Sequence, residues 1–493
     1  MPTWLQTIFI WLYALPSLVL AFFAINMYVL VILFKRRLKA HRQEVTDLYA
    51  AFEASGTELP LVVTQLPIYN EFNVIESCLR AVVAMQYPAG RHHIQILDDS
   101  TDETSELVDR LAAELRAEGA HIDILRRENR IGYKAGALEA AMQHTEADYF
   151  AIFDADFCPP DDFLLRAMPL LVQQPKVGLI QARWGHLNRN ESLLTQAQAI
   201  AIDGHFTVEQ PARAWNGLFM NFNGTAGIWK RAAIEGAGGW EHDTLTEDMD
   251  LSYRAQLAGW KPFFAWDLEA PAELPQDINA FKSQQFRWAK GSIETARKLL
   301  PRVLRAPQVS LFAKAQAIFH LTHYFMHPII LFMAFMTYPV LRFTWLQQHP
   351  LPFGMLIGVI LLSTLAPASL YAVAQNALGT GSWKRLRVMP VLSIIGIGIA
   401  VSNTRAVWQA MRGKKSGFVR TPKRGENNTI RYRISMPWLA VIELCIGAYC
   451  FFTLVEYLLS KREAAVPFIF LYAMGFTGVG LLSLLEAFRV NRG

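Results

Sequence analysis

One stretch in the middle of the chain decides the fold class, and it reads Tyr149-Phe150-Ala151-Ile152-Phe153-Asp154-Ala155-Asp156. Its first five residues are apolar or aromatic, which is typical of a buried strand. Two aspartates one residue apart follow at once. Ligands of α/β sheets bind beyond the carboxyl ends of strands, and there such a pair can present oxygens to one hard cation. The structural alternative is that both side chains cap a turn.

Comparable short runs lie on either side of this stretch. Residues 61–63 and 94–97 have strand composition, and helical patterns cover residues 73–85 and 103–118. This alternation predicts βαβ units in a doubly wound, mostly parallel sheet. No apolar run between residues 61 and 300 approaches the roughly 20 residues that span a bilayer. A nucleotide-binding α/β domain over residues 35–300 is therefore expected.

The rest of the chain has the composition of a membrane protein. Overall, 52% of residues are hydrophobic and only 18% are charged, which is too apolar for an ordinary soluble enzyme. Residues 1–34 carry no charge and form the expected N-terminal anchor, and five basic residues follow within 35–42. Membrane proteins carry an excess of Lys and Arg on their cytoplasmic side, so the α/β domain is expected in the cytoplasm, beneath the cell membrane.

A C-terminal membrane region is expected over residues 301–493. Four apolar runs in it are long enough to cross a bilayer: about 315–341, 351–374, 435–459 and 466–488. A shorter run, Met389–Val401, precedes the basic loop 412–433, which should stay in the cytoplasm, so this run is predicted to be interfacial or re-entrant. Five spans result. Residues 294–306 have the composition of an amphipathic helix on the inner membrane surface.

Two further segments are suited to a nucleoside diphosphate. Pro67-Ile68-Tyr69-Asn70-Glu71 closes the first strand and opens a helix, where backbone amides can hold an anion. Lys134 lies among small residues within Asn129–Ala137, where its charge can approach phosphate closely. A structural turn and an exposed lysine at a helix start are the respective alternatives. The pair Asp98 and Asp99 ends the second strand, at the same edge of the expected sheet.

Two more segments lie towards the end of this domain. Thr246-Glu247-Asp248 places acids at the start of a helix, which dipole complementarity alone also explains. In Gln284-Gln285-Phe286-Arg287-Trp288, a planar indole suits a sugar ring and the guanidinium suits a phosphate. An interfacial tryptophan beside a snorkelling arginine is the alternative.

Taken in order, these motifs resemble those of the family 2 glycosyltransferases of the GT-A fold, and most closely the cellulose, mannan and glucomannan synthases. The resemblance implies that Asp98, Asp99 and Lys134 hold the nucleotide, with Pro67, Tyr69 and Glu71 beside them. It implies a metal at Asp154 and Asp156, and a general base at Asp248 with Glu247 adjacent. Gln284, Arg287 and Trp288 would shape the acceptor and diphosphate end of the cleft, whose floor would be Asn223-Gly224-Thr225.

A last match lies in the basic loop. Phe418-Val419-Arg420-Thr421-Pro422-Lys423 resembles the gating loop of cellulose synthases, so Phe418, Thr421 and Lys423 are expected to close over the donor. The sequence departs from that pattern, because Arg420 replaces a valine and a proline precedes the lysine.

The function implied by this resemblance is inverting transfer of a hexose from a UDP- or GDP-sugar to a growing β-1,4-glucan or (gluco)mannan-like polysaccharide, with Mg²⁺ or Mn²⁺ as cofactor. Membrane lipids and a second copy of the chain are the expected partners, and nucleic acid is not. One alternative is a glycolipid synthase that adds a sugar to diacylglycerol or a ceramide-like lipid. Another is a non-catalytic scaffold or transporter with a decayed transferase domain.

A polar and aromatic cluster marks the start of the 315–341 run: His320, Thr322, His323, Tyr324 and His327. In a polymer synthase it would line the entrance through which the product leaves. The alternative is that these side chains satisfy neighbouring helices.

Overall fold

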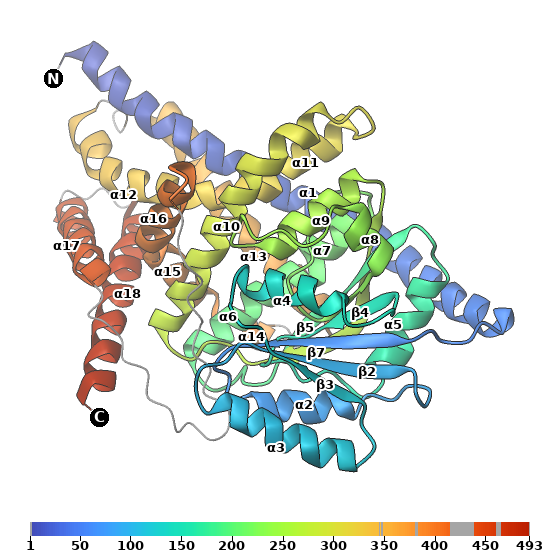
Figure 1. Ribbon diagram of the computed structural model, residues 1–493. Helices are drawn as coiled ribbons and strands as arrows, with labels where there is room; N and C mark the ends of the chain where they lie inside the picture. The colour runs from blue at the N-terminus through green and yellow to red at the C-terminus, as the bar shows by residue number, and fades with distance from the viewer. Residues whose placement is uncertain are drawn as a thin grey trace.

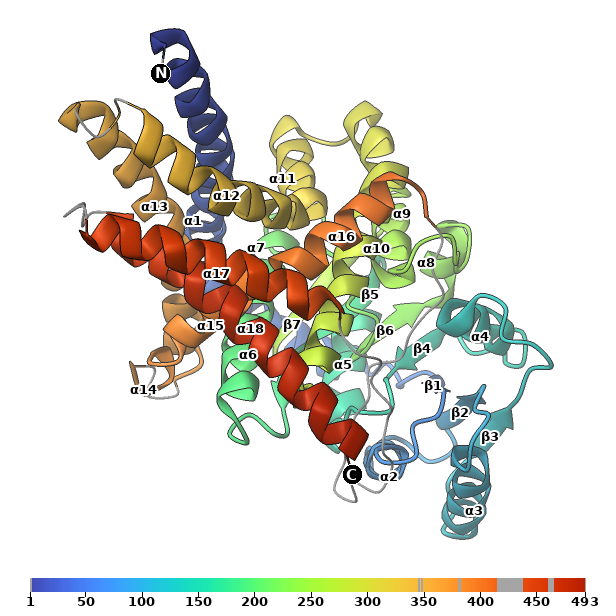
Figure 2. The same ribbon diagram turned by 90° about the vertical axis from the view of Figure 1, so that its left-hand side faces the viewer.

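The computed structural model describes residues 2–344, 346, 349–379, 383–414, 438–459 and 465–492 (Figure 1). A sheet domain lies at one side of the molecule, and the N- and C-terminal helices gather at the other (Figure 2). The predicted fold class, a GT-A-type α/β domain with flanking apolar helices, is confirmed.

The domain is built on one mixed sheet of seven strands in the order β3-β2-β1-β4-β6-β5-β7. Its strands are β1 Val62–Ile68, β2 His92–Asp98, β3 Ile122–Leu125, β4 Tyr149–Ile152, β5 Val177–His186, β6 Gly227–Lys230 and β7 Lys261–Ala272. Every neighbouring pair is parallel except those of β6, which runs antiparallel to β4 and β5. The carboxyl ends of β1, β2, β4, β5 and β7 therefore point to the same edge, as the strand patterns predicted.

Helices cover both faces of the sheet because alternate strand residues point to opposite sides. Val62 and Leu66 of β1 pack on one face, and Val63 packs on the other. The helices and helical turns of the domain are α2 Ile75–Val83, α3 Thr104–Ala117, α4 Tyr133–Met142, α5 Phe163–Val172, α6 Leu193–Gly204, the π-helical η1 His205–Glu209, α7 Gln210–Ala214, α8 Arg231–Gly236, α9 Glu247–Leu257 and α10 Ile278–Arg305.

Within the described residues, five helical segments are long and apolar enough to cross a membrane, as the hydropathy pattern predicted. They are α1 Thr3–Ser55, α11 Leu311–Thr322 with η2 His323–Phe325 and α12 Met326–Phe343, α13 Pro350–Ala377, α17 Trp438–Leu459, and α18 Val466–Arg492. The short α14, Trp383–Leu386, follows α13. After it come α15 Met389–Gly398 and α16 Ala400–Met411. The helical stretch Lys384–Gly398 and α16 form a pair bent by 44°, which is either a broken span or a re-entrant loop. The re-entrant interpretation of Met389–Val401 stays a prediction.

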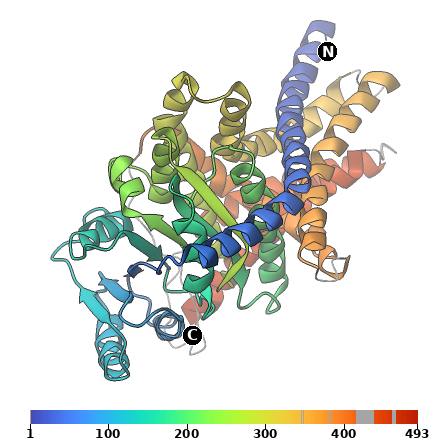
Figure 3. The ribbon, with the colours of Figure 1, turned by 90° about the vertical axis from the view of Figure 1, so that its right-hand side faces the viewer.

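Two elements extend further than their apolar patterns indicate. Helix α1 does not end with the uncharged run at residue 34 but continues over the domain (Figure 3), where the Tyr49 hydroxyl donates to the Arg166 carbonyl at 2.8 Å. Residues 294–306 are not a separate helix, because all but the last belong to α10. Leu299 and Val303 are buried there against α9 and α11.

A buried ion pair joins the domain to the C-terminal helices. Lys282 of α10 donates to both carboxylate oxygens of Glu443 in α17, at 2.7 and 2.8 Å, and to the Ser483 hydroxyl of α18 at 3.2 Å. Glu486 accepts from the amides of Ile278 and Asn279, which begin α10. The helix carrying the Gln284–Trp288 motif is therefore held directly by two span-capable helices.

Candidate active site

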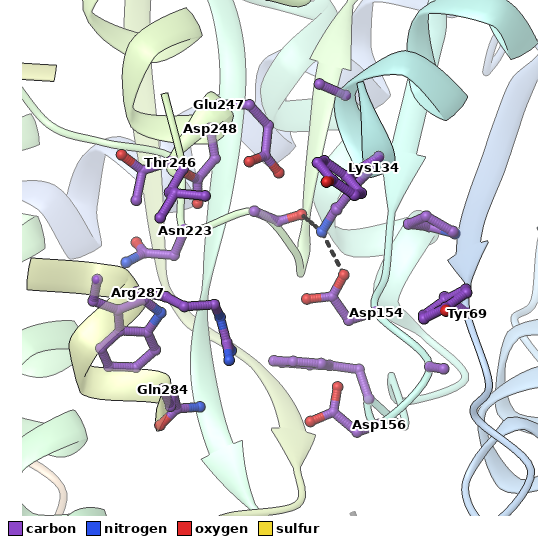
Figure 4. Close-up of a pocket in the computed structure, with 18 of the residues that line it drawn as sticks. Tyr69, Lys134, Asp154, Asp156, Asn223, Thr246, Glu247, Asp248, Gln284 and Arg287 are labelled. Atoms are coloured by element: carbon purple, nitrogen blue, oxygen red, sulfur yellow. Dashed lines mark hydrogen bonds and ion pairs between the residues drawn. The ribbon is translucent and has the colours of Figure 1, made fainter. Parts of the chain in front are cut away.

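A cavity of ≈ 710 Å³ opens at the shared edge of the strands, between β1, β4, β5 and β7 on one side and the starts of α9 and α10 on the other. Most of the side chains expected from the sequence line it: Pro67, Tyr69, Glu71, Asp99, Lys134, Asp154, Asp156, Asn223, Gly224, Glu247, Asp248, Gln284, Arg287 and Trp288. Figure 4 shows how these motifs face one another across the cavity. Residues about 220 positions apart in the sequence thus line one cavity.

Two expected residues lie behind the wall instead. Asp98 is buried and does not line the cavity, because its carboxylate accepts from the Ser100 amide at 3.0 Å and from Arg126 Nε at 2.8 Å. Thr225 is also buried, and its hydroxyl accepts from the Asp154 amide at 2.9 Å. Both support the loops that carry the lining residues. The gating-loop residues Phe418, Thr421 and Lys423 lie outside the described residues.

Arginines that the motif search missed organise the wall around Tyr69. Arg127 forms an ion pair with Asp99 and donates to the Ile131 carbonyl at 2.9 Å. The Arg130 guanidinium lies over the Tyr69 ring, 3.2 Å from its centroid. These arginines could have been predicted from their position after β3, because that position lies at the same edge of the sheet as the other motifs.

Lys134 connects three motifs. Its ammonium forms an ion pair with Asp154 and donates to the Gly224 carbonyl at 2.8 Å (Figure 4). Burial works to lower the pKa of Lys134, but the carboxylates of Asp154 and Glu247 outweigh it and raise the pKa above its usual range. The lysine therefore remains a cation facing the cavity.

Gly224 is required by its surroundings. Its φ of +82° is favourable only for glycine, and an added Cβ would lie 3.0 Å from Asp248 Oδ2 and 3.4 Å from Lys134 Nζ. Among the described residues, the three with positive φ that are not glycine are Asn70, Tyr133 and Ala226, and each is in or next to a motif of the cavity wall. Such backbone strain gathers at functional sites.

Two adjacent carboxyl groups start α9. Burial, and then the neighbouring Glu247 carboxylate, raise the pKa of Asp248 to about 8. Burial also raises the pKa of Glu247, although Lys134 opposes this. Asp248 Oδ1 accepts from the Met249 amide at 2.7 Å, which orients the side chain. A carboxylate whose pKa lies near neutrality is suited to proton abstraction.

Helix α10 holds the segment that precedes these acids. Glu294 accepts from the Leu245 amide at 3.0 Å, and the hydroxyls of Thr246 and Thr295 are 3.1 Å apart. Gly291 permits this close packing, because a Cβ there would lie 2.5 Å from Thr246 Cγ2. The Thr246–Asp248 and Gln284–Trp288 motifs are therefore positioned as one unit.

On the same α10, Arg287 supplies positive charge to the cavity. Burial lowers its pKa to about 10, against the opposing effect of Asp154. The guanidinium therefore remains charged at neutral pH. It faces Asp154 and Asp156 across the cavity in Figure 4.

Asp154 and Asp156 follow β4 and offer oxygen donors from one loop, the donor set that Mg²⁺ and Mn²⁺ prefer. They therefore fit the expected divalent cation. A second carboxylate group, Glu241, Asp243 and Asp250, also has its oxygens close together. Lys298 lies among them, with Nζ 2.6 Å from Asp243 and 2.9 Å from Asp250, so this group is an ion-pair network that braces the loop before α9.

One side of the cavity was not predicted from the sequence. Trp184 and His186 at the end of β5, and Glu273 after β7, line it. They belong to no recognisable motif, and only the pairing of β5 with β7 brings them to the cavity.

The polar cluster of the 315–341 run does not line this cavity. His320 is buried, with Nδ1 2.7 Å from the Tyr253 hydroxyl and Nε2 3.1 Å from Asn221 Oδ1. His327 Nε2 lies 2.9 Å from the Asn403 side-chain nitrogen. Contacts with neighbouring elements thus account for both ring nitrogens of His320 and for one of His327, whose Nδ1 is buried without a hydrogen-bond partner among the described residues. The channel entrance stays a prediction.

Comparison with known proteins gives a consistent set of relatives. Residues 60–291 match the family model described as "Glycosyltransferase like family 2". Over 450 residues, the chain is 33% identical to glucomannan 4-beta-mannosyltransferase 7 of Arabidopsis thaliana, an alignment that covers 86% of this chain and 78% of the relative.

Shorter alignments reach higher identity. The chain is 42% identical to glucomannan 4-beta-mannosyltransferase 2 of Arabidopsis thaliana over 271 residues, and 42% identical to glucomannan 4-beta-mannosyltransferase 1 of Oryza sativa subsp. japonica over 272 residues. Each alignment covers 54% of this chain, and about half of the relative's own length, 51% and 52% respectively.

Among solved structures, the chain is similar to a mannosyltransferase of Pyrobaculum calidifontis in complex with GDP-Man and Mn²⁺. The TM-score is 0.47 at 18% identity, and the match covers 78% of this chain and all of that one.

Proposed function

This chain belongs to the family 2 glycosyltransferases, together with the plant glucomannan 4-beta-mannosyltransferases, and from that membership we propose that it transfers mannose from a nucleoside-diphosphate sugar onto a growing β-1,4-linked, mannan-like polysaccharide. Membership makes it a hexosyltransferase. The lipid-acceptor alternative is not favoured, because the relatives are named for transfer within a polysaccharide.

The single observation that carries the proposal is the convergence of the motifs on one cavity. Lys134 and Arg287 bring positive charge to the cavity, where a diphosphate needs it to bind and leave, and the Asp248 carboxyl lies in the same cavity at the start of α9 (Figure 4). An inverting transfer requires a base for the acceptor hydroxyl and positive charge for the leaving diphosphate. This one cavity holds both, which suits single displacement by an acceptor hydroxyl.

In this mechanism Asp248 removes the proton from the attacking hydroxyl. Its raised pKa gives it the proton affinity of a base near neutrality, and Glu247 keeps that pKa high. Lys134 and Arg287 stabilise the negative charge that develops on the leaving diphosphate. The Gly224 carbonyl fixes Lys134, so its charge needs no reorganisation during the reaction.

We assign the expected divalent cation to Asp154 and Asp156. When bound, Mg²⁺ or Mn²⁺ neutralises a diphosphate leaving group. The donor is a GDP- or UDP-hexose, and GDP-mannose is the first candidate because the named relatives are mannosyltransferases.

The five span-capable helices make the chain a membrane protein. We place it in the cell membrane with the catalytic domain in the cytoplasm, because five basic residues follow the uncharged first 34. The domain then meets cytoplasmic nucleotide sugars directly. Residues 1–34, 35–300 and 301–493 serve as anchor, catalytic domain and membrane region, with the anchor helix continuing over the domain surface.

The proposal is tested with the purified full chain in detergent or nanodiscs, supplied separately with labelled GDP-mannose, GDP-glucose and UDP-glucose. Each donor is tested with a manno-oligosaccharide acceptor, with diacylglycerol, and without any acceptor as a control. The expected product is an oligosaccharide lengthened by mannose that an endo-β-1,4-mannanase degrades. Labelled lipid alone, or no sugar product from any donor, would refute it.

A further inference from the structure

The side of the cavity formed by β5 and β7 lies outside the established motifs. Trp184 and His186 are two residues apart in β5, so they point to the same face, and both line the cavity. Their register partners in β7 are Ala270 and Ala272, whose small side chains leave room beside them. Glu273 continues the same wall.

His186 is held by a buried carboxylate. Its Nε2 lies 2.8 Å from Oδ1 of Asp203, and both side chains are almost fully buried, at 2% and 1% exposure. Asp203 also accepts from Arg189 and from Gln375, both at 2.6 Å. Burial opposes its ionisation, but the hydrogen bonds from His186 and Arg189 lower the pKa of Asp203 to about 2. The group is therefore a carboxylate with three donors.

This arrangement determines what His186 presents to a ligand. An ionised carboxylate only accepts hydrogen bonds, so Nε2 must carry the hydrogen. In the neutral imidazole, Nδ1 is then an acceptor. Nδ1 is buried and has no hydrogen-bond partner within the part of the chain that the structure describes.

Two neighbouring residues show the same feature. Trp184 Nε1, a donor, and Gln284 Oε1, an acceptor, are also buried without a partner among the described residues. Trp288 lies one helical turn from Gln284, and its ring is 6.5 Å from that of Trp184. Buried polar atoms in folded proteins are nearly always hydrogen-bonded. Three such atoms on residues that line one cavity, beside two indole rings, indicate a ligand with several hydroxyl groups and apolar ring faces.

We propose that Trp184, His186 and Gln284 form the subsite for the terminal saccharide ring of the acceptor, with Asp203 as the positioning residue that orients His186. An acceptor hydroxyl donates to His186 Nδ1, and another accepts from Trp184 Nε1. The inference rests on the proposed function and extends it to acceptor recognition. Gln375, near the end of α13, also ties this subsite to a span-capable helix.

The position of the subsite supports an acceptor over the donor. The donor side of the cavity is marked by Arg130, Lys134 and the Asp154 loop, all suited to an anionic nucleotide. By contrast, Trp184, His186 and Gln284 offer hydrogen bonds and ring stacking, which suit a neutral sugar. A saccharide is also favoured over a lipid tail, because a lipid tail would leave all three polar atoms unsatisfied.

The test measures mannose transfer to a manno-oligosaccharide and donor hydrolysis without acceptor, in the same full-length preparations. His186→Phe removes Nδ1 and should raise the acceptor KM at least ten-fold. It should lower the ratio of transfer to hydrolysis by at least the same factor. Trp184→Phe keeps an aromatic ring stacked against Phe206 but removes the indole N–H, and it should raise the acceptor KM several-fold. His186→Asn, whose amide lies on the Nδ1 side, should recover part of the loss.

Exposed His144, replaced by phenylalanine, serves as the matched control. An unchanged acceptor KM in His186→Phe and Trp184→Phe, with active wild type, would overturn the subsite alone. A parallel fall of transfer and hydrolysis would also overturn it, because that outcome marks a purely structural role. Wild-type protein that transfers sugar to no saccharide would overturn the proposed function, and the subsite with it.

Discussion

Replacing Asp248 with asparagine should lower catalytic turnover but raise the stability of the fold. The amide cannot take a proton, so turnover should fall by the roughly 10² to 10⁴ typical of a lost general base, or about 3–5 kcal/mol of transition-state stabilisation. Donor affinity should change much less, because Lys134 and Arg287 keep their positions and charges. The measurements are kcat with GDP-mannose and acceptor, and the dissociation constant of GDP.

The same substitution should stabilise the fold at high pH. A folded-state pKa of about 8, against the ordinary aspartate value of 3.8, means that ionising Asp248 opposes folding. Below the pKa that Asp248 has in the unfolded chain, its contribution to the free energy of unfolding is fully present. This contribution is lost as the pH rises through the folded-state pKa near 8. Each unit of pKa is about 1.4 kcal/mol. Because the side chain is only part-buried, solvent screening reduces the total to on the order of 2 kcal/mol.

Thermal unfolding of nucleotide-free protein across pH 4 to 9 checks this expectation. The melting temperature of Asp248→Asn should exceed that of wild type increasingly with pH. Exposed Asp123 on β3, replaced by asparagine, is the matched control and should show no such trend. Wild-type kcat/KM should also fall as pH drops below about 8. Near-normal turnover of Asp248→Asn would refute the base assignment, and a pH-independent stability difference would refute the electrostatic reasoning.

Three other outcomes are expected. Chelation with EDTA should reduce transfer more than ten-fold and added Mn²⁺ or Mg²⁺ should restore it, whereas full activity after exhaustive chelation would exclude the metal. Gly291→Ala places a Cβ 2.5 Å from Thr246 and should lower kcat at least ten-fold, while Gly354→Ala, which meets nothing within 4 Å, should be silent in the same assay. Glu443→Gln leaves the Lys282 charge buried without its carboxylate partner and should cost about 3–5 kcal/mol of stability. The double replacement Lys282→Met with Glu443→Leu should recover most of the melting temperature. A double mutant that recovers none of it would contradict the ion-pair account.

Local sequence patterns were sufficient to predict much of this protein's fold. The apolar run before Asp154 predicted β4, and apolar stretches of bilayer length predicted the five span-capable segments. These succeed because strand burial and membrane insertion depend on the composition of contiguous residues. Motif order then predicted the family and most of the cavity wall, since parallel strands deliver their carboxyl ends to one edge.

Other properties depended on contacts between distant residues. Asp98 and Asp99 are adjacent and chemically identical, yet Arg126 draws the first away from the cavity while the second lines it. Trp184 and His186 carried no signal, because only the pairing of β5 with β7 and the approach of Asp203 give them a ligand-binding arrangement.

The extent of α1 and the basicity of Asp248 show the same division. The sequence by itself determined that residues 1–34 are apolar, and that an acid pair begins a helix. Only the tertiary structure decided that α1 continues over the domain and that Asp248 lies part-buried beside Glu247, with a pKa near 8. The physical reason is that composition sets what a segment prefers locally. Desolvation, charge proximity and hydrogen-bond partners are set by whichever distant residues the fold places within a few ångströms.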